Sequence, residues 1–254
     1  MPVARDDLLR FLDEYLDTPK MQDYGPNGLQ VPGAREIQRV ALGVDASLAF
    51  LQRAAAWGAQ AALVHHGLFW QRGPLGITER LKARLKVLFD HDMNLIAYHL
   101  PLDRHPEVGN NAELVRLLGL QRSEQPFGAH AGTYLGAIGI ADPPLPLEVL
   151  VARLVQTLHN RPLIMPYGPD PLHRIGIVSG AGAAHLDEAI GAGLDAFLTG
   201  EPSEPSQEIA REAGITFIAA GHYATETVGV QALGRVLEDR FNLECCFFDV
   251  PNPV

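Results

Sequence analysis

Short apolar runs typical of buried strands alternate along this chain with segments whose apolar residues have helical spacing. This alternation predicts an α/β fold with largely parallel or mixed sheets. In the first half we predict helices at 5–17, 47–57, 78–91 and 110–118, strands at 40–44, 61–66 and 94–99, and a turn-rich loop at 24–33. In the second half we predict strands at 133–140, 174–178, 195–199, 216–221 and 243–250, and helices from the Pro-rich segment 142–146 to His159 and at 183–191, 204–213 and 225–239.

The chain is long enough for one large or two smaller domains. Turn chemistry at residues 125–128 favours a boundary there. The segment 216–239 carries His222 and Glu226, which would complete a polar site that His65 and His66 begin in the first half of the chain. We therefore predict two interleaved α/β lobes, with residues 1–125 plus 223–254 in the first domain and 126–222 in the second. The site is expected in a cleft at the carboxyl ends of the strands.

The net charge of −10 disfavours a nucleic-acid-binding function. The most basic stretch, residues 80–86, lies within a helical pattern, where it is expected to form a solvated face. The N-terminus has no apolar stretch of the signal-peptide kind, and no segment approaches a membrane span. Cys245 and Cys246 are adjacent in a strand pattern and would point to opposite faces, which disfavours a mutual disulfide. We expect a cytoplasmic protein.

Imidazoles and carboxylates follow three of the predicted strands. His65 and His66 end the strand 61–66, His99 ends the strand 94–99, and His222 follows the strand 216–221. In open α/β sheets, ligands bind beyond the carboxyl ends of the strands. A single histidine at a strand end is more often a hydrogen-bonded residue than a ligand, but three such ends together favour a metal site.

The spacing of these residues indicates more than one metal ion. Neighbouring side chains of a strand diverge, so His65 and His66 would each serve a different ion where the strand gives way to a turn. His222 and Glu226 are four residues apart at a helix start and share one face, while Asp103 follows His99 by four residues in a loop. The alternatives for His99 are a ligand and a residue that orients Asp103 or a metal-bound water.

Several segments resemble the Nif-three-like (YbgI) family, whose members are often labelled GTP cyclohydrolase type 2 homologs. They occur in family order and span nearly the whole chain. The matching segments are Asn27-Gly-Leu-Gln-Val31, His65-His-Gly-Leu-Phe-Trp70, residues 98–111, Thr199-Gly-Glu201 and Gly221-His-Tyr-Ala-Thr-Glu226. The loop Gly25-Pro-Asn-Gly28 departs from the Asp-Asn-x-Gly pattern of many relatives.

This resemblance implies the Nif-three-like fold, with two divalent metal ions per subunit. Mixed imidazole and carboxylate ligands accept zinc, iron and manganese alike. The resemblance implies His65 and His222 as ligands of one ion, His66 and Asp103 as ligands of the other, and Glu226 as a bridge. It also implies a toroidal homohexamer built as a trimer of dimers. The label points to a metal-dependent hydrolase that acts on a small molecule.

Amide, cyclic amidine and phosphoester bonds are all open as substrates of such a hydrolase. Glu201 and His99 are the candidate catalytic residues for proton transfer, and the alternative for Glu201 is a helix N-terminal carboxylate favoured by the dipole. The alternative function is a non-catalytic metal-binding or metal-delivery scaffold that acts through protein partners. Trp70 either walls a substrate pocket or packs.

Overall fold

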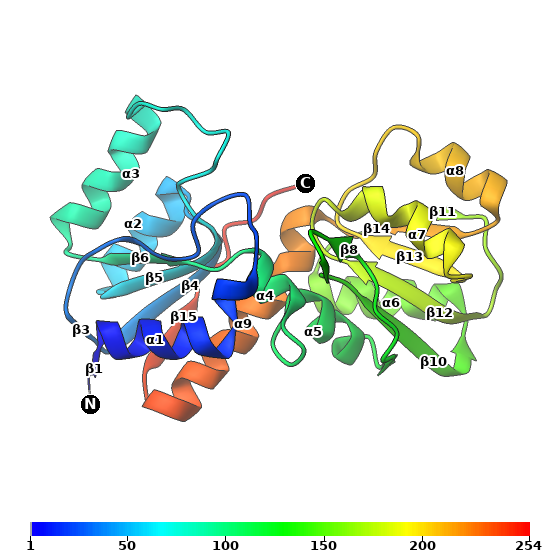
Figure 1. Ribbon diagram of the computed structural model, residues 1–254, viewed down its shortest axis with the longest axis horizontal. Coiled ribbons are helices and arrows are strands. Elements are labelled where there is room, and N and C mark those ends of the chain that lie inside the picture. Colours follow the sequence, from blue (N-terminus) through cyan, green and yellow to red (C-terminus); the bar gives the residue numbers. More distant parts are fainter. Residues whose placement is uncertain (1) are drawn as a thin grey trace. The chain divides into compact units, whose positions relative to one another are not determined.

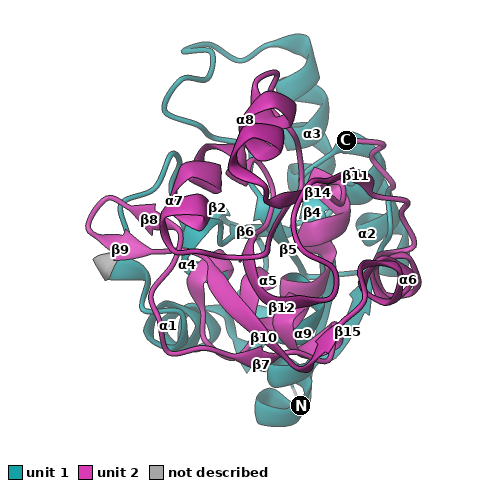
Figure 2. Cartoon of the chain, turned by 90° about the vertical axis from the view of Figure 1, so that its right-hand side faces the viewer, with its two compact units in different colours: residues 1–102, 230–250 teal, residues 103–229, 251–254 magenta. Residues whose placement is uncertain are grey.

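The computed structural model describes residues 2–254 and divides the chain into two compact units, coloured separately in Figure 2. The first unit consists of residues 1–102 and 230–250, and the second of residues 103–229 and 251–254. These ranges differ from the predicted domains chiefly at residues 103–125. That segment belongs to the second unit because of its contacts with the strand at 137–145. The helix at 110–117 packs on this strand, and residues 121–122 pair with it.

The first unit is built on a five-stranded sheet of order β15-β4-β5-β6-β2. The first four strands are mutually parallel, and β2 runs antiparallel to β6 at the edge. The strands are β15 (Glu244–Phe247), β4 (Arg39–Asp45), β5 (Ala61–His66), β6 (Asn94–Ala97) and β2 (Gly28–Val31), with a separate antiparallel pair of β1 (Val3–Ala4) and β3 (Glu36–Ile37). The edge strand β2 corrects the prediction of a continuous loop at 24–33.

Helices lie against both faces of this sheet (Figure 1). The buried residues of α2 and α3 pack with those of β4, β5 and β6 in one core cluster. On the other face, Gly234 of α9 lies so close to Leu42 of β4 that a Cβ atom would collide with it. The helices of this unit are α1 (Arg5–Tyr15), the 3-10 helix η1 (Thr18–Lys20), α2 (Leu48–Trp57), α3 (Glu79–Asp90), the start of α4 (Leu100–Arg104) and the end of α9 (His222–Phe241).

The second unit is built on a six-stranded mixed sheet of order β11-β14-β13-β12-β10-β7. The three strands β12, β13 and β14 are parallel, and the outer strands run antiparallel to their neighbours. The strands are β11 (Leu163–Pro166), β14 (Thr216–Ala219), β13 (Ala196–Thr199), β12 (Leu172–Val178), β10 (Ala137–Leu145) and β7 (Gln121–Arg122), with a small hairpin of β8 (Ala129–His130) and β9 (Thr133–Tyr134).

Two core clusters, one on each face, hold this second sheet between helices. Leu114, Leu150 and Leu154 of α5 and α6 are buried against one face, and Leu186 and Ala210 of α7 and α8 against the other. The helices are α5 (Asn110–Leu117), α6 (Leu147–Leu158), the 3-10 helix η2 (Gly182–His185), α7 (Leu186–Gly191), α8 (Ser206–Ala213) and the first turns of α9. The predicted α/β class with mixed sheets is confirmed.

The predicted strand 133–140 and the Pro-rich hinge after it differ from the structure. The strand is divided between β9 and β10, and β10 continues through the Pro-rich segment to Leu145. The pairing of β10 with β12 shifts register between Ile140 and Leu145. Proline, which has no N–H to donate to the ladder, is accommodated at such an irregularity.

Candidate metal centre

Three parallel strands of the first unit end in polar side chains that face one another. β4 ends at Asp45, β5 at His65 and His66, and His99 follows β6 by two residues. Asp45 and His66 are register partners in the parallel ladder. The ring nitrogens of His65, His66 and His99 lie within 4.8 Å of one another. We call these three residues the histidine group.

Every imidazole of the histidine group has its Nδ1 atom next to an oxygen. His65 Nδ1 lies 3.1 Å from the carbonyl oxygen of Tyr98, His66 Nδ1 lies 2.8 Å from Asp45 Oδ1, and His99 Nδ1 lies 2.7 Å from Asp23 Oδ1. The Tyr98 carbonyl can only accept, so Nδ1 of His65 carries a proton and Nε2 keeps the lone pair. This is the arrangement found around metal-binding histidines, where the outer oxygen sets the tautomer.

Asp23 is anchored by more than its contact with His99. It accepts hydrogen bonds from Asn27 Nδ2 and from the backbone N–H of Leu100, at 2.9 Å each. Burial by itself would raise the pKa of Asp23, but the contacts with His99 and these donors together lower the pKa of that carboxyl below its usual value. Asp23 is therefore a carboxylate that holds His99 from a loop remote in sequence.

In the second unit, three parallel strands again end in polar residues. Ser179 follows β12, Glu201 follows β13, and His222 follows β14 and begins helix α9. Asp103, on the short helix α4 rather than in the predicted loop, lies with these residues. Among Asp103, His222 and Glu226, the ligand atoms of Glu226 lie within 4.8 Å of those of each of the other two. We call these three residues the carboxylate group.

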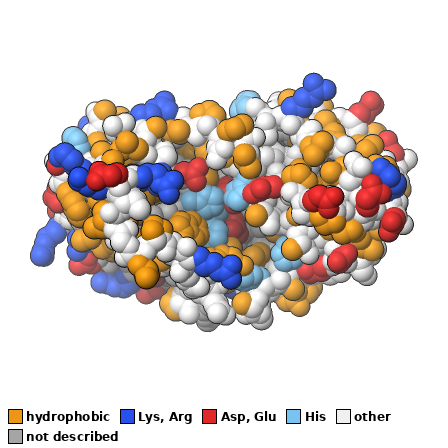
Figure 3. Space-filling model, turned by 90° about the horizontal axis from the view of Figure 1, so that it is seen from above, with side chains coloured by type: hydrophobic (Ala, Val, Ile, Leu, Met, Phe, Trp, Pro, Cys, Tyr) orange, Lys and Arg blue, Asp and Glu red, His pale blue; other side chains and the backbone are white. Residues whose placement is uncertain are grey.

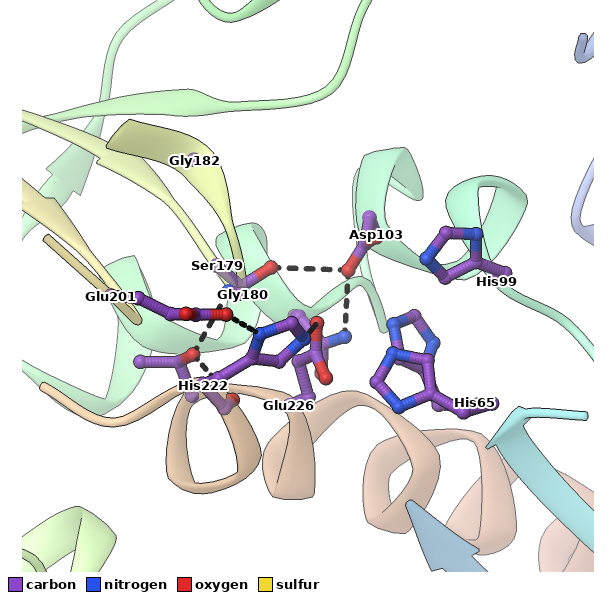
Figure 4. Close-up of polar contacts among 12 residues, drawn as sticks. His65, His99, Asp103, Ser179, Gly180, Gly182, Glu201, His222 and Glu226 are labelled. Atoms are coloured by element: carbon purple, nitrogen blue, oxygen red, sulfur yellow. Dashed lines mark hydrogen bonds and ion pairs between the residues drawn. The ribbon is translucent and has the colours of Figure 1, made fainter. Parts of the chain in front are cut away.

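One oxygen of Asp103 is held by two neutral donors. Asn110 Nδ2 donates to Asp103 Oδ1 at 2.8 Å, and Ser179 Oγ donates to the same oxygen at 3.1 Å (Figure 4). Asn110 is fixed in turn, because its Oδ1 accepts from the backbone N–H of Gly229 at 2.8 Å. Asp103 is 7% exposed, so this carboxylate is oriented within a buried environment.

His222 lies between two carboxylates, as Figure 4 shows. Its Nδ1 contacts Glu201 Oε1, and its Nε2 lies 3.2 Å from Glu226 Oε1. Burial disfavours the charged imidazole, but hydrogen bonds and charge from Glu226 and Glu201 outweigh it and raise the pKa of His222 to about 9. A divalent cation at His222 would compete with the proton for the Nε2 atom, which faces Glu226.

The donors in both groups fit a divalent transition metal. Neutral imidazoles and carboxylates are the ligands that zinc, iron and manganese accept. Glu226 is 2% exposed and His65 is fully buried. A buried carboxylate is costly unless it is paired or coordinates a cation.

Comparison with known proteins decides the family. The sequence model of Duf34/NIF3 (NGG1p interacting factor 3) matches residues 3–253. The chain belongs to the NIF3 family. It is 45% identical over 256 residues to a protein of Pseudomonas aeruginosa named "GTP cyclohydrolase 1 type 2 homolog", with all of both chains covered. An Escherichia coli K12 protein of the same name is 40% identical, covering 97% of this chain and 98% of that protein.

NIF3-family structures have the same fold. A solved structure titled "protein ybgI, unknown function" superposes with a TM-score of 0.93 at 39% identity, over 99% of this chain and 100% of the other. A protein from Thermus thermophilus gives a TM-score of 0.90 at 40% identity, with the same coverage. The resemblance and the fold class predicted from the sequence are thus confirmed.

Four residues that contact members of the two groups in this NIF3-family chain were not predicted from the sequence as site residues: Asp23, Asp45, Asn110 and Ser179. Asp45 directly follows the predicted strand 40–44, so its place at a strand end was a usable signal. Asp23 gave no such signal, because it meets His99 across 76 residues of chain. Ser179 directly follows the predicted strand 174–178, and in the structure its hydroxyl donates to Asp103.

Two further observations concern partners of this NIF3-family chain. On the face shown in Figure 3, Lys and Arg side chains stand apart from one another rather than forming one continuous patch. Among the described residues, no helix combines the length and the apolar character that crossing a membrane requires.

Proposed function

We propose that this chain is a dinuclear metal-dependent hydrolase in which His65, His66, Asp103, His222 and Glu226 bind two divalent ions. The observation that carries the proposal is the oxygen at Nδ1 of each of the three proposed histidine ligands. Tyr98 O, Asp45 and Glu201 contact His65, His66 and His222 respectively. Histidines that bind metal typically have their other ring nitrogen hydrogen-bonded to an oxygen, which fixes the tautomer and the orientation of the ring.

Bound divalent ions would lower the pKa of a water molecule and polarise a carbonyl or phosphoryl oxygen of the substrate. The chain's own residues would orient the ligands. Glu201 holds Nδ1 of His222, and Asn110 and Ser179 hold Asp103. These contacts favour a positioning role for Glu201. His99, paired with Asp23, is the better candidate to move a proton at its Nε2 atom.

The substrate bond is proposed as an amide, a cyclic amidine or a phosphoester. The name of the P. aeruginosa relative supports cyclohydrolase-type chemistry without establishing it, since a shared fold does not fix a substrate. An activity screen of metal-loaded protein against pooled substrates of these three classes tests the proposal. Turnover that is lost in Asp103→Asn supports a hydrolase. Stable metal binding with no turnover in any class supports the non-catalytic scaffold instead.

Metal content tests the ligand assignment separately from activity. We expect elemental analysis to find up to two transition ions per chain, and His66→Ala and Glu226→Gln each to lower that content. The matched control is His91→Ala, which removes an exposed imidazole at the end of α3. Unchanged metal content in both ligand variants would overturn the assignment.

A further inference from the structure

The basic stretch at residues 80–86, predicted to form a solvated face, is only partly solvated. Its other basic residues are exposed on α3, but Arg84 is half-buried. Arg84 precedes Leu88 by one helical turn, and Leu88 is packed at 1% exposure in a core cluster of the first unit. Residues four apart share one face of a helix, so Arg84 lies along the side of α3 that is turned toward the core.

The start of α3 is close to the edge of the sheet where the histidine group lies. β5 and β6 are parallel neighbours in the sheet, and α3 is the helix between them in the chain. A helix in such a crossover starts beyond the carboxyl end of the first strand and returns along the sheet. Arg80 and Arg84, in the first two turns of α3, are therefore nearer than Leu88 to the edge where β5 ends at His66.

The charge of Asp45 acts on Arg84. Burial and the positive charge of Arg80 lower the pKa of Arg84, and the negative charge of Asp45 partly offsets them. Interactions between charges weaken with distance and with screening by salt, so the two side chains are neighbours. Asp45 also contacts His66 Nδ1 at 2.8 Å. Arg84 is thus in the neighbourhood of the Asp45–His66 pair, within the first unit.

The two arginines have no carboxylate of their own. Within the described part of the chain, neither Arg80 nor Arg84 forms a hydrogen bond or an ion pair, whereas the lysines of the stretch pair with carboxylates of the same helix. The Nε atom of Arg84 is buried and has no hydrogen-bond partner among the described residues, whereas its terminal Nη atoms are not enclosed. A buried polar group without a partner is costly. An anion at the Nη atoms would compensate the poorly solvated charge of Arg84.

A phosphate group fits this pair of arginines. Residues four apart on a helix have Cβ atoms about 5–6 Å apart, so their guanidinium groups can converge on one ligand. A phosphate monoester carries a charge of about −1.5 to −2 at pH 7 and three acceptor oxygens. Guanidinium groups bind such oxygens in pairs of hydrogen bonds. A carboxylate carries a single charge and would neutralise only one of the two arginines.

We propose that Arg80 and Arg84 bind a phosphate group of the substrate beside the Asp45–His66 pair. The inference rests on the proposed function and narrows it to phosphorylated small molecules. The two arginines are then specificity-determining residues, because they hold the phosphate while the proposed metal centre acts on the substrate.

Isothermal titration calorimetry on the full chain tests this proposal, with phenyl phosphate as the probe and benzoate as its carboxylate counterpart. The titrations use protein as purified and protein from which metal has been removed with a chelator, because bound metal ions would also attract phosphate. We expect saturable binding of phenyl phosphate in both preparations, and benzoate binding at least about fivefold weaker.

Variants of the two arginines should weaken phenyl phosphate binding in the chelator-treated protein. We expect a loss of about tenfold for Arg84→Gln and of about three- to tenfold for Arg80→Gln, which changes an exposed side chain and leaves the core untouched. Arg84→Lys keeps the charge but not the planar fork, so it should bind about threefold more weakly than the wild type.

The matched control is Lys82→Gln, which removes one positive charge from the same helix. Residue 82 is two positions from each arginine, about 200° around the helix, and its side chain is exposed. Its affinity should equal that of the wild type within about twofold. Three results would each overturn the proposal: no saturable binding to the chelator-treated wild type, equal losses in Lys82→Gln and Arg84→Gln, or equal binding of benzoate and phenyl phosphate.

The alternative role for Arg84 is to hold Asp45 and, through it, His66. In that case Arg84→Gln would lower the metal content and leave the affinity for phenyl phosphate unchanged, which would also overturn the proposal.

The same measurements separate the phosphate site from the proposed function. Phenyl phosphate binding that depends on Arg84, in protein that neither retains metal nor turns over substrate, would support the phosphate site while the hydrolase proposal fails. Turnover of phosphorylated and phosphate-free substrates with equal KM values, unchanged in Arg84→Gln, would overturn the phosphate site while the hydrolase proposal stands.

Discussion

At the scale of single residues, the chemistry of this chain depends on how oxygens are placed around imidazoles. His222 is the strongest case, because carboxylates lie at both of its ring nitrogens. Sequence spacing pairs His222 with Glu226, one helical turn away. It does not pair His222 with Glu201, which arrives from the neighbouring strand end.

The raised pKa of His222 predicts a pH-dependent stability for the metal-free protein. The pKa in the folded state, about 9, exceeds the ordinary value of 6.5. The stabilisation from charged His222 is therefore complete below about pH 6.5 and is lost as the pH rises through about 9, with an upper bound of about 3–4 kcal/mol. We expect the melting temperature of chelator-treated protein to fall over this range more steeply than that of His222→Gln. Parallel curves for the two proteins would contradict the assignment.

Two features make Gly180 hard to replace, its backbone conformation and the lack of space for a side chain. Its φ is +62°, and an added Cβ would collide with Glu226 Oε1. We expect Gly180→Ala to lower both the metal content and the free energy of unfolding, the latter by about 1–3 kcal/mol in urea titrations. Gly193→Ala is the control, because Gly193 has a φ of +64° with nothing within 4 Å of the added Cβ. Equal effects of the two substitutions would show that backbone strain alone is responsible.

At the scale of elements, parallel strands explain why the functional side chains gather. Parallel strands in register bring their carboxyl ends to one edge of the sheet. Each unit has three such ends, carrying Asp45, His66 and His99 in the first and Ser179, Glu201 and His222 in the second. The alternating pattern in the sequence predicted these strands well, since buried parallel strands are continuous apolar runs.

The register of β4 and β5 predicts a metal phenotype for Asp45, which is not itself a proposed ligand. Asp45→Asn keeps the shape of the side chain but removes the charge that holds Nδ1 of His66. We expect metal affinity to fall by about 10–100-fold in competition with a chromogenic chelator. Asp90→Asn, an exposed residue paired with Lys86 on α3, should leave the affinity unchanged. An Asp45→Asn affinity equal to that of the wild type would remove Asp45 from the proposed centre.

At the scale of the whole molecule, family membership extends over the full length of the chain. The family resemblance, rather than any single feature of the sequence, supports the proposal that this protein assembles as a homohexamer. Several large apolar side chains of the first unit are exposed in the single chain, among them Leu75, Ile77 and Phe89. Burial of such side chains between subunits would remove apolar surface from water.

We expect the protein to sediment as a homohexamer of about 166 kDa, six times the 27.6 kDa of one chain. Sedimentation velocity over a hundredfold range of protein concentration would measure this. A single species with the mass of one chain throughout that range would contradict the proposed assembly.

The sequence by itself determined the α/β class, most strand and helix positions, the family, and the proposed ligands, because apolar periodicity and strand-end motifs are local signals. It did not determine where the unit boundary falls, the strand pairing through 142–146, or the roles of Asp23 and Asn110. Those depend on segments far apart in the chain that meet only when the sheets form. The adjacent histidines His65 and His66 are visible in the sequence, but the oxygens beside their Nδ1 atoms, at Tyr98 and Asp45, are brought to them by the tertiary structure.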